Sequence, residues 1–233
     1  MPAKLVLVRN AGVPVLRLSR AGIFLFQRTS TMYDLSSSRP DHPITRVSRH
    51  LGRHAALLIT IVAVLWLVEI IDLLFMRGNL DNMGIRPRTW NGLGQILIAP
   101  WLHVGFGHLI ANTLPLVILG WLVMLRHMRD FVVVTWVSAL VSGLGIWLFG
   151  GSRTIHLGAS GVIFGLLGAL LARAYFERSW AALGLALIAG FLYGGMLWGV
   201  LPGTPGVSWL GHFFGLLGGI LAAWLLADRD IPR

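Results

Sequence analysis

The stretch SGVIFGLLGALLARAYF, residues 160–176, is apolar over nearly its whole length and contains one charged residue, Arg173. A helix that is apolar on every side has to be buried in a large core or in a membrane. Of the 233 residues in the chain, only 12% are charged and 56% are hydrophobic, and the mean hydropathy is +0.76. Soluble domains carry roughly 25% charged residues. We therefore predict an integral membrane protein and exclude an ordinary soluble enzyme and a disordered chain.

Five more apolar stretches of similar length accompany residues 160–176. They lie at residues 55–75, 106–125, 131–149, 181–200 and 208–227. Each stretch can cross the roughly 30 Å hydrocarbon core of a bilayer as a helix. The predicted fold is therefore an all-α bundle of six transmembrane helices. The sequence contains no cysteine, which excludes disulfides and thiol catalysis.

Three segments lie outside the predicted spans. Residues 1–54 form a basic tail, expected to be partly disordered, in which the apolar run 21–26 is too short for a signal peptide and Met32 is an alternative start. Residues 228–233 form a short second tail. The connector 76–105 is long and is expected to be a structured loop that skims the outer face of the membrane.

Positive charge is distributed unevenly between the two sides of the predicted bundle. The side with both tails carries 15 Lys and Arg residues, and the opposite side carries four. By the positive-inside rule both termini lie in the cytosol. The formal net charge of +10 therefore marks orientation in the membrane, and we predict no nucleic-acid partner.

Polar side chains within the predicted spans are unfavourable unless each has a partner or a function, and four of them are singled out by their position. They are His108, Asn112, Ser160 and His212. These residues fall near the starts of the second, fourth and sixth spans. Even-numbered spans all run from outside to inside, and a helix rises about 1.5 Å per residue. The four side chains therefore lie at a similar shallow depth below the outer face, where they can meet.

The residues around Ser160 suit a nucleophile with an oxyanion site. Gly158 and Gly161 allow backbone N–H groups to approach a reacting atom, and the start of a helix there contributes its positive dipole end. His108 and Asn112 are four residues apart, so they share one helical face and can both donate to one point.

Small residues follow both Ser160 and His212 at spacings that permit close helix packing. They are Gly161, Gly165 and Gly168 in one span, and Gly211, Gly215 and Gly219 in the other. Close packing would bring the His212 imidazole within hydrogen-bond reach of the Ser160 hydroxyl, with His212 as a general base. The sequence thus predicts a serine–histidine dyad. Taken singly, the serine could be a helix cap, the histidine a structural residue, and the glycines packing positions.

Other polar residues leave alternatives open. Glu69 and Asp72, near the outer end of the first span, are expected to pair with loop arginines such as Arg77, or else to line a proton or substrate pathway. A metal site that combined His103 and His156 with the span histidines has no supporting carboxylate or HExxH spacing. We therefore predict no metal and no cofactor. An aspartyl intramembrane protease is excluded, since it needs two aspartates deep in separate helices.

Three motifs resemble those of the rhomboid family of intramembrane serine proteases. They are GASG at residues 158–161, the HxxxN pair of His108 and Asn112, and His212 within GHFFGLLGG. Their arrangement over the second, fourth and sixth spans also resembles the family, and the resemblance covers residues 55–227. With no seventh apolar stretch, the chain resembles the bacterial six-helix form.

The resemblance implies a role for each motif residue. Ser160 is the nucleophile and His212 is the general base. The oxyanion hole is formed by His108, Asn112 and the Ser160 backbone N–H. The supporting positions are Gly158, Gly161, Phe164 and His103. Phe164 stands where some members have a tyrosine that packs on the histidine, so it can stack but cannot donate a hydrogen bond.

The predicted function is intramembrane serine endopeptidase, cleaving transmembrane segments of membrane proteins near the outer face of the bilayer. The substrate helix enters sideways and unwinds locally. One alternative is a non-catalytic rhomboid-like protein that binds membrane helices, and a small transporter is another. The preponderance of arginine over lysine favours a GC-rich, bacterial source, and therefore a multi-pass protein of the bacterial plasma membrane. The sequence leaves the natural substrate, the pathway and the oligomeric state open.

Overall fold

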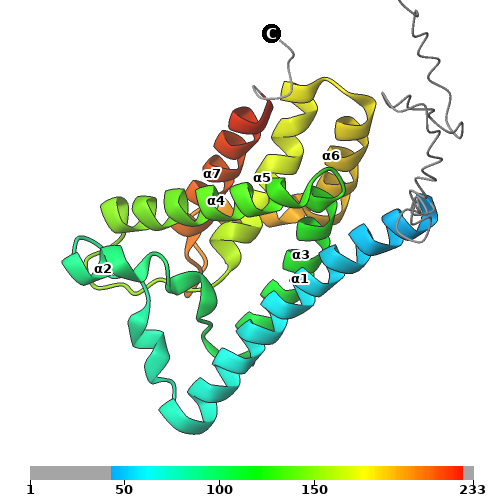
Figure 1. The fold of residues 1–233 in the computed structure, drawn as a ribbon. Helices are drawn as coiled ribbons and strands as arrows, with labels where there is room; N and C mark the ends of the chain where they lie inside the picture. Colours follow the sequence, from blue (N-terminus) through cyan, green and yellow to red (C-terminus); the bar gives the residue numbers. More distant parts are fainter. Residues whose placement is uncertain (1–42, 228–233) are drawn as a thin grey trace, which may run out of the picture. The chain divides into compact units, whose positions relative to one another are not determined.

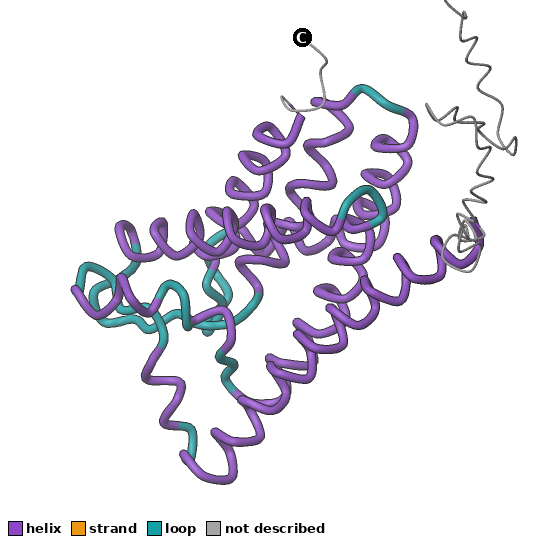
Figure 2. Tube along the Cα trace, in the orientation of Figure 1, coloured by secondary structure: helices purple, strands orange, loops and turns teal. Residues whose placement is uncertain are grey.

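The computed structural model describes residues 43–227, with side chains from Ser48 onwards. Every regular element in this range is helical, as the colouring of Figure 2 shows. The α-helices are α1 (Pro43–Ile71), α2 (Trp90–Gln95), α3 (Gly105–Met124), α4 (Met128–Phe149), α5 (Ser160–Glu177), α6 (Trp180–Tyr193) and α7 (Trp209–Ala227) (Figure 1). The short π- and 3-10-helical segments are η1 (Asp72–Met76), η2 (Asn79–Met83), η3 (Ala99–Trp101) and η4 (Gly194–Val200). The predicted all-α class is confirmed.

Six of these helical segments are long and apolar enough to cross a membrane. They are Ser48–Met76, Gly105–Met124, Met128–Phe149, Ser160–Glu177, Trp180–Val200 and Trp209–Ala227. These ranges agree with the predicted spans to within a few residues, apart from the start of the first. Helix α1 already begins at Pro43, so residues 43–54 are helical although the sequence placed them in the tail. Proline fits the first turn of a helix, where its missing N–H would have no partner.

Several sequence predictions concern parts of the chain that the structure does not describe. The remainder of the basic tail, residues 1–42, and the second tail, 228–233, lie outside the described residues, as does the alternative start at Met32. The cytosolic orientation of the termini remains a prediction.

Helix α5 is the centre of the bundle and packs against α3, α4, α6 and α7. Of its span 61% is buried, whereas only 11% of the span formed by α6 and η4 is buried. The tightest packing joins α5 to α7, because a Cβ added at Gly215 would overlap the carbonyl of Gly161, and one at Gly219 would overlap the carbonyl of Gly165. The glycine faces predicted from the sequence therefore let these two backbones touch.

Helix α1 lies at the edge of the bundle and packs mainly against α3. Leu58 and Leu65 are buried, and the indole N–H of Trp66 donates to the hydroxyl of Thr113 at 3.2 Å. The first span therefore extends the apolar core on the α3 side, and these contacts are with α3 and not with the polar residues of α5 and α7.

The connector between η1 and α3 is structured, with α2 packed against the end of α4 (Figure 1). The Arg88 guanidinium donates to the carbonyls of Leu148 at 3.1 Å and Gly150 at 2.7 Å, and the Trp147 indole donates to the Thr89 carbonyl at 2.7 Å. Beneath them a small apolar cluster contains Ile85, Ile96, Ala99 and Ile146. The loop is thus fastened to α4; its depth in the membrane remains a prediction.

The predicted pairing of Glu69 or Asp72 with Arg77 is wrong within the described part of the chain. No ion pair joins them there; instead, the Asp72 carboxylate accepts the backbone N–H of Leu80 at 3.0 Å. Arg77 adopts a left-handed conformation, φ 54°, which ends η1 and turns the chain back over Asp72. Burial and the nearby charge of Asp72 raise the pKa of Asp81, so this end of α1 holds its acids in a sheltered turn.

Candidate active site

Ser160 and His212 are in hydrogen-bond contact. Ser160 is the first residue of α5, and His212 lies in the first turn of α7. The Ser160 Oγ is 2.9 Å from the Nε2 of His212. This proximity depends on the helix contact just below it, where only a glycine at 215 leaves room for the Gly161 carbonyl.

The His212 ring is held from two further directions. Its Nδ1 lies 2.9 Å from the carbonyl oxygen of Gly199 in η4. A carbonyl can only accept, so Nδ1 carries the proton of the neutral ring and Nε2 is free to accept from the Ser160 hydroxyl. Phe164, one turn after Ser160, stacks on the imidazole with ring centroids 4.1 Å apart and planes inclined by 8°. The sequence indicated the phenylalanine contact but gave no sign of the Gly199 carbonyl.

His108 and Asn112 line the same cavity as Ser160 and His212, with a volume of about 710 Å³. The amide of Asn112 donates one hydrogen to the His108 carbonyl at 3.0 Å, which leaves its second N–H available. The His108 Nδ1 accepts a long hydrogen bond from the Val104 N–H at 3.5 Å, so its proton is on Nε2. The structure therefore brings together the four polar residues singled out in the sequence.

Gly158 is needed where the chain passes the His108 ring. Its φ is +116°, a conformation that other residues rarely adopt. A Cβ at this position would lie 2.6 Å from Cε1 of His108 and 3.0 Å from its Nε2. The absence of a side chain therefore lets the imidazole sit directly against the backbone that leads into Ser160.

His103 lies behind this arrangement and is 2% exposed. Its Nε2 accepts the Ala159 N–H at 3.5 Å, and its ring meets the His108 ring edge-on, with centroids 5.1 Å apart. Burial, with a smaller contribution from His108, lowers the pKa of His103 to about 4. The imidazole is therefore neutral at physiological pH and supports the backbone of the GASG turn.

His156 also lines the cavity, and sequence reasoning considered it only as a metal ligand. Its ring nitrogens lie 2.8 Å from the Thr154 hydroxyl and 2.7 Å from the Ser208 hydroxyl, and its backbone pairs with Ile85. Burial lowers the pKa of the imidazole. His156 thus joins the loops that precede α5 and α7. The sequence contains no signal for this role, because Ser208 lies 52 residues away along the chain.

The histidines do not converge as metal ligands. Both ring nitrogens of His156 and both of His212 are occupied by hydrogen bonds. Within residues 43–227 no group of three or more His, Asp or Glu residues is arranged to hold a metal ion. The site offers a hydroxyl, imidazoles and amide donors instead.

The fold and the cavity define a multi-pass helical membrane protein in which a serine hydroxyl contacts an imidazole near one end of the spans. Residues 90–229 match the family model of the Rhomboid domain, and the chain belongs to the rhomboid family. Membership supports an intramembrane protease-like function in general terms, although the family also includes inactive members.

Several relatives are similar over most of the chain. The uncharacterized protein Rv1337 of Mycobacterium tuberculosis is 41% identical over 206 residues, which cover 83% of this chain and 85% of the relative. The uncharacterized protein ML1171 of Mycobacterium leprae is 42% identical over 190 residues, or 74% of this chain and 71% of the relative. The putative rhomboid protease YdcA of Bacillus subtilis is 28% identical over 164 residues, or 65% and 75%.

Proposed function

We propose that this protein is an intramembrane serine endopeptidase in which Ser160 is the nucleophile and His212 the general base. The observation that carries the proposal is the 2.9 Å contact between the Ser160 Oγ and the His212 Nε2, with Nδ1 bound to the Gly199 carbonyl. That carbonyl selects the tautomer in which Nε2 can take a proton. A serine is unreactive unless a base takes its proton, and the geometry supplies one.

The reaction follows from this proton transfer. His212 takes the Ser160 proton as the hydroxyl oxygen attacks the scissile carbonyl of the substrate. The imidazolium then gives that proton to the leaving amine, and the peptide C–N bond breaks to form an acyl-enzyme. A water molecule, deprotonated by His212, attacks the acyl group, and the proton returns to Ser160 as the new carboxyl end departs.

The developing oxyanion has three candidate donors. They are the backbone N–H of Ser160 at the start of α5, the Nε2–H of His108, and the second N–H of Asn112. The α5 N-terminus adds its positive dipole end. His108 and Asn112 both line the cavity that Ser160 borders. Each such donor can contribute roughly 10²- to 10³-fold to the rate.

A neutral carbonyl orients His212 where soluble triads use a carboxylate. It fixes the tautomer and the ring position, but it stabilises the imidazolium less than a negative charge would. Phe164 restricts the ring further by stacking. We therefore expect slower turnover than in a soluble serine protease.

The substrate in this proposal is the transmembrane helix of another membrane protein. It approaches sideways past α6 and η4, the span with the least buried surface, which also borders the cavity through Met196. The helix has to unwind before its carbonyl can be attacked, because helical hydrogen bonds and side chains shield it. Small or helix-breaking residues near the cut should therefore be preferred.

Charge distribution and the mycobacterial relatives support a place in a bacterial plasma membrane with both termini in the cytoplasm. In this orientation, the cavity that contains Ser160 lies toward the outer face. Cleavage of the substrate would then occur near that face.

Labelling by a fluorophosphonate tests the proposal without a known substrate, because the probe reacts with an activated serine. The purified wild-type protein should be labelled, and labelling should disappear in both Ser160→Ala and His212→Ala. Ser152→Ala, which alters an exposed loop serine, is the matched control and should label normally. A folded wild-type protein that fails to label would overturn the proposal and favour a non-catalytic role in binding membrane helices.

A further inference from the structure

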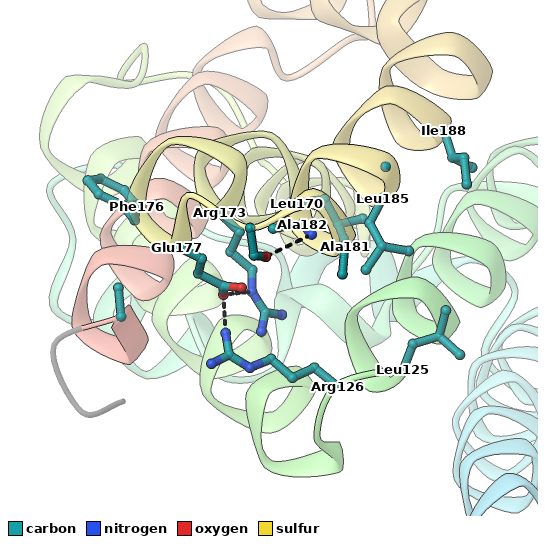
Figure 3. A pocket seen from close by; sticks show the side chains of 13 residues that line it. Leu125, Arg126, Leu170, Arg173, Phe176, Glu177, Ala181, Ala182, Leu185 and Ile188 are labelled. Carbon is teal, nitrogen blue, oxygen red and sulfur yellow. Dashed lines mark hydrogen bonds and ion pairs between the residues drawn. The ribbon is translucent and has the colours of Figure 1, made fainter. Parts of the chain in front are cut away.

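A second cavity lies at the other end of the spans, away from Ser160. It has a volume of about 830 Å³ and is bordered by the end of α3, the end of α5, the start of α6 and the last residue of α7 (Figure 3). Alternating span direction puts all four borders at the same side of the membrane, next to the chain termini. The cavity is separate from the proposed active site, and the inference below does not depend on that site.

Arg173 gives this cavity a buried donor that lacks an acceptor. Its side chain is on α5 and 4% of its surface is exposed. Nη2 donates to Asp130 at 2.9 Å and Nε donates to Glu177, but Nη1 has no acceptor among residues 43–227. Buried N–H donors almost always have a partner. The Nη1 group therefore points to an acceptor supplied from outside the chain.

The surrounding charge favours an anion as that acceptor. Figure 3 shows the Arg126 and Arg173 guanidinium groups bound to the same carboxylate, that of Glu177. The charged residues that line the cavity are Arg126, Arg173 and Glu177, and the connectors that flank it add Arg129, Arg178 and Asp130. The excess is positive, and planar guanidinium donors match the oxygens of a phosphate.

The remaining wall of the cavity is apolar and open toward lipid. Leu170 forms its buried floor, while Leu125 and Ile188 also border it and are about half exposed. A soluble anion would leave this wall uncovered. A lipid covers it with an acyl chain while its head group stays at the level of the arginines, where the spans end.

We propose that this cavity binds an anionic phospholipid of the leaflet next to the chain termini. The lipid phosphate accepts from Nη1 of Arg173, and one acyl chain lies along Leu185 and Ile188. Because its walls come from α3, α5, α6 and α7, the bound lipid also joins α6 to the rest of the bundle.

Native mass spectrometry of the purified full-length chain tests this binding. Phosphatidylglycerol, phosphatidylcholine with the same acyl chains, and soluble glycerol phosphate are added separately. We expect retention of phosphatidylglycerol about tenfold above phosphatidylcholine, because both lipids present a phosphate but the choline ammonium adds a positive charge beside Arg126 and Arg173, and we expect no retention of glycerol phosphate. Equal retention of the two lipids, or retention of glycerol phosphate alone, would overturn the proposal.

Two variants locate the site. Gly184→Trp fills the cavity from α6 without a backbone clash, because a Cβ there has nothing within 4 Å. Leu187→Trp, on the same helix at a side chain that is 65% exposed, is the matched control. Phosphatidylglycerol retention should fall about tenfold in Gly184→Trp and stay unchanged in Leu187→Trp. Unchanged retention in both folded variants would show that the lipid binds elsewhere.

Arg173→Lys provides an independent readout. Lysine keeps a positive charge next to Asp130 and Glu177 but lacks the separate Nη1 donor. Retention of phosphatidylglycerol should fall about tenfold, while the unfolding temperature without added lipid should fall less than in Arg173→Leu, because the ammonium still faces Asp130 and Glu177. Full retention of the anionic lipid in this variant would contradict the role given to Nη1.

Discussion

The two ends of α5 use polar side chains in opposite ways. At the Ser160 end, the groups that line the cavity are hydroxyls, amides and imidazoles, and they interact by hydrogen bonds. At the other end, Arg173 is paired with Asp130 and Glu177. The two cavities are similar in size, about 710 and 830 Å³. One helix thus separates a region without fixed charge from a region held by ion pairs.

This difference shows what each end requires. A proton can move between Ser160 and His212 only if the imidazole starts neutral, and a cation close by would oppose protonation of the ring. His103, whose pKa is lowered to about 4, adds no charge at neutral pH. The other end has no such requirement. There the ion pair between Arg173 and Asp130 holds the last turns of α5 against the first turn of α4. The predictions below compare the two ends, starting with the largest effect.

Replacement of Ser160 by Ala should reduce cleavage of a transmembrane reporter by at least about 10⁴-fold, because it removes the nucleophile. The unfolding temperature in detergent should change little. Arg129→Ala, which alters an exposed residue at the opposite end, should keep cleavage within a few-fold of wild type. Initial rates in proteoliposomes measure both effects, and substantial cleavage by purified Ser160→Ala would refute the proposed nucleophile.

Replacement of Arg173 by Leu should destabilise the fold by about 3–5 kcal/mol, since it leaves the buried Asp130 carboxylate without its partner, whereas Glu177 keeps its ion pair with Arg126. Unfolding in a graded denaturant series in micelles measures this change. Ser160→Ala serves as the comparison at the other end and should lie within about 1 kcal/mol of wild type. If both variants unfolded alike, the contrast between the two ends would be wrong.

Replacement of Asn112 by Ala should lower kcat by roughly 100-fold and leave KM nearly unchanged, because an oxyanion donor acts mainly in the transition state. Fluorophosphonate labelling should slow but remain detectable. A rise in KM with unchanged kcat would instead assign Asn112 to substrate binding.

Acidification should lower the free energy of unfolding through His103, which lies at the Ser160 end of α5. The pKa of His103 is about 4 in the folded protein and 6.5 in an unperturbed histidine, so the unfolded chain binds more protons between these values. The free energy of unfolding should therefore fall as the pH drops from 6.5 toward 4, by up to about 1.4 kcal/mol per pH unit for this group.

Unfolding midpoints measured across this pH range test the effect. His103→Asn should show a shallower dependence than wild type, with a remaining slope from His156, whose pKa is also lowered. Identical slopes in the two proteins would indicate that His103 is not held neutral.

The smallest change is expected for Phe164→Leu. Loss of the stacked ring at 4.1 Å should reduce kcat by about tenfold or less, because His212 keeps its bonds to Ser160 and to the Gly199 carbonyl. Phe164→Tyr preserves the stacking and should stay near wild type. Kinetics of a reporter peptide separate the two variants, and equal losses in both would argue against stacking as the cause.

Much of the fold could be predicted because the membrane simplifies the problem. Uniformly apolar stretches have one stable arrangement in lipid, so six helices follow from hydropathy alone. The same scarcity of polar groups made Ser160 and His212 conspicuous, and the direction of the spans brought them to one depth. The helical start at Pro43 was missed because residues 43–54 extend α1 beyond the apolar stretch.

Two features of the site were beyond the reach of the sequence. The Gly199 acceptor is a main-chain atom, and its position depends on the change from α6 to η4 after Tyr193. The role of His156 depends on its contacts with Thr154 and Ser208, which lie in different loops. Side-chain patterns cannot report either feature, because both are set by how distant loops meet.

The Gly199 carbonyl has a consequence for genetics. Every amino acid has this carbonyl, so a complete substitution scan leaves the acceptor of His212 chemically intact at each position. What such a scan can detect at Gly199 is crowding, because a Cβ would lie 3.1 Å from the Phe164 ring and 3.3 Å from the His212 Nδ1. Loss of activity on substitution of Gly199 would therefore indicate that the position requires a small residue. Such a screen would not detect the role of the carbonyl oxygen that orients His212.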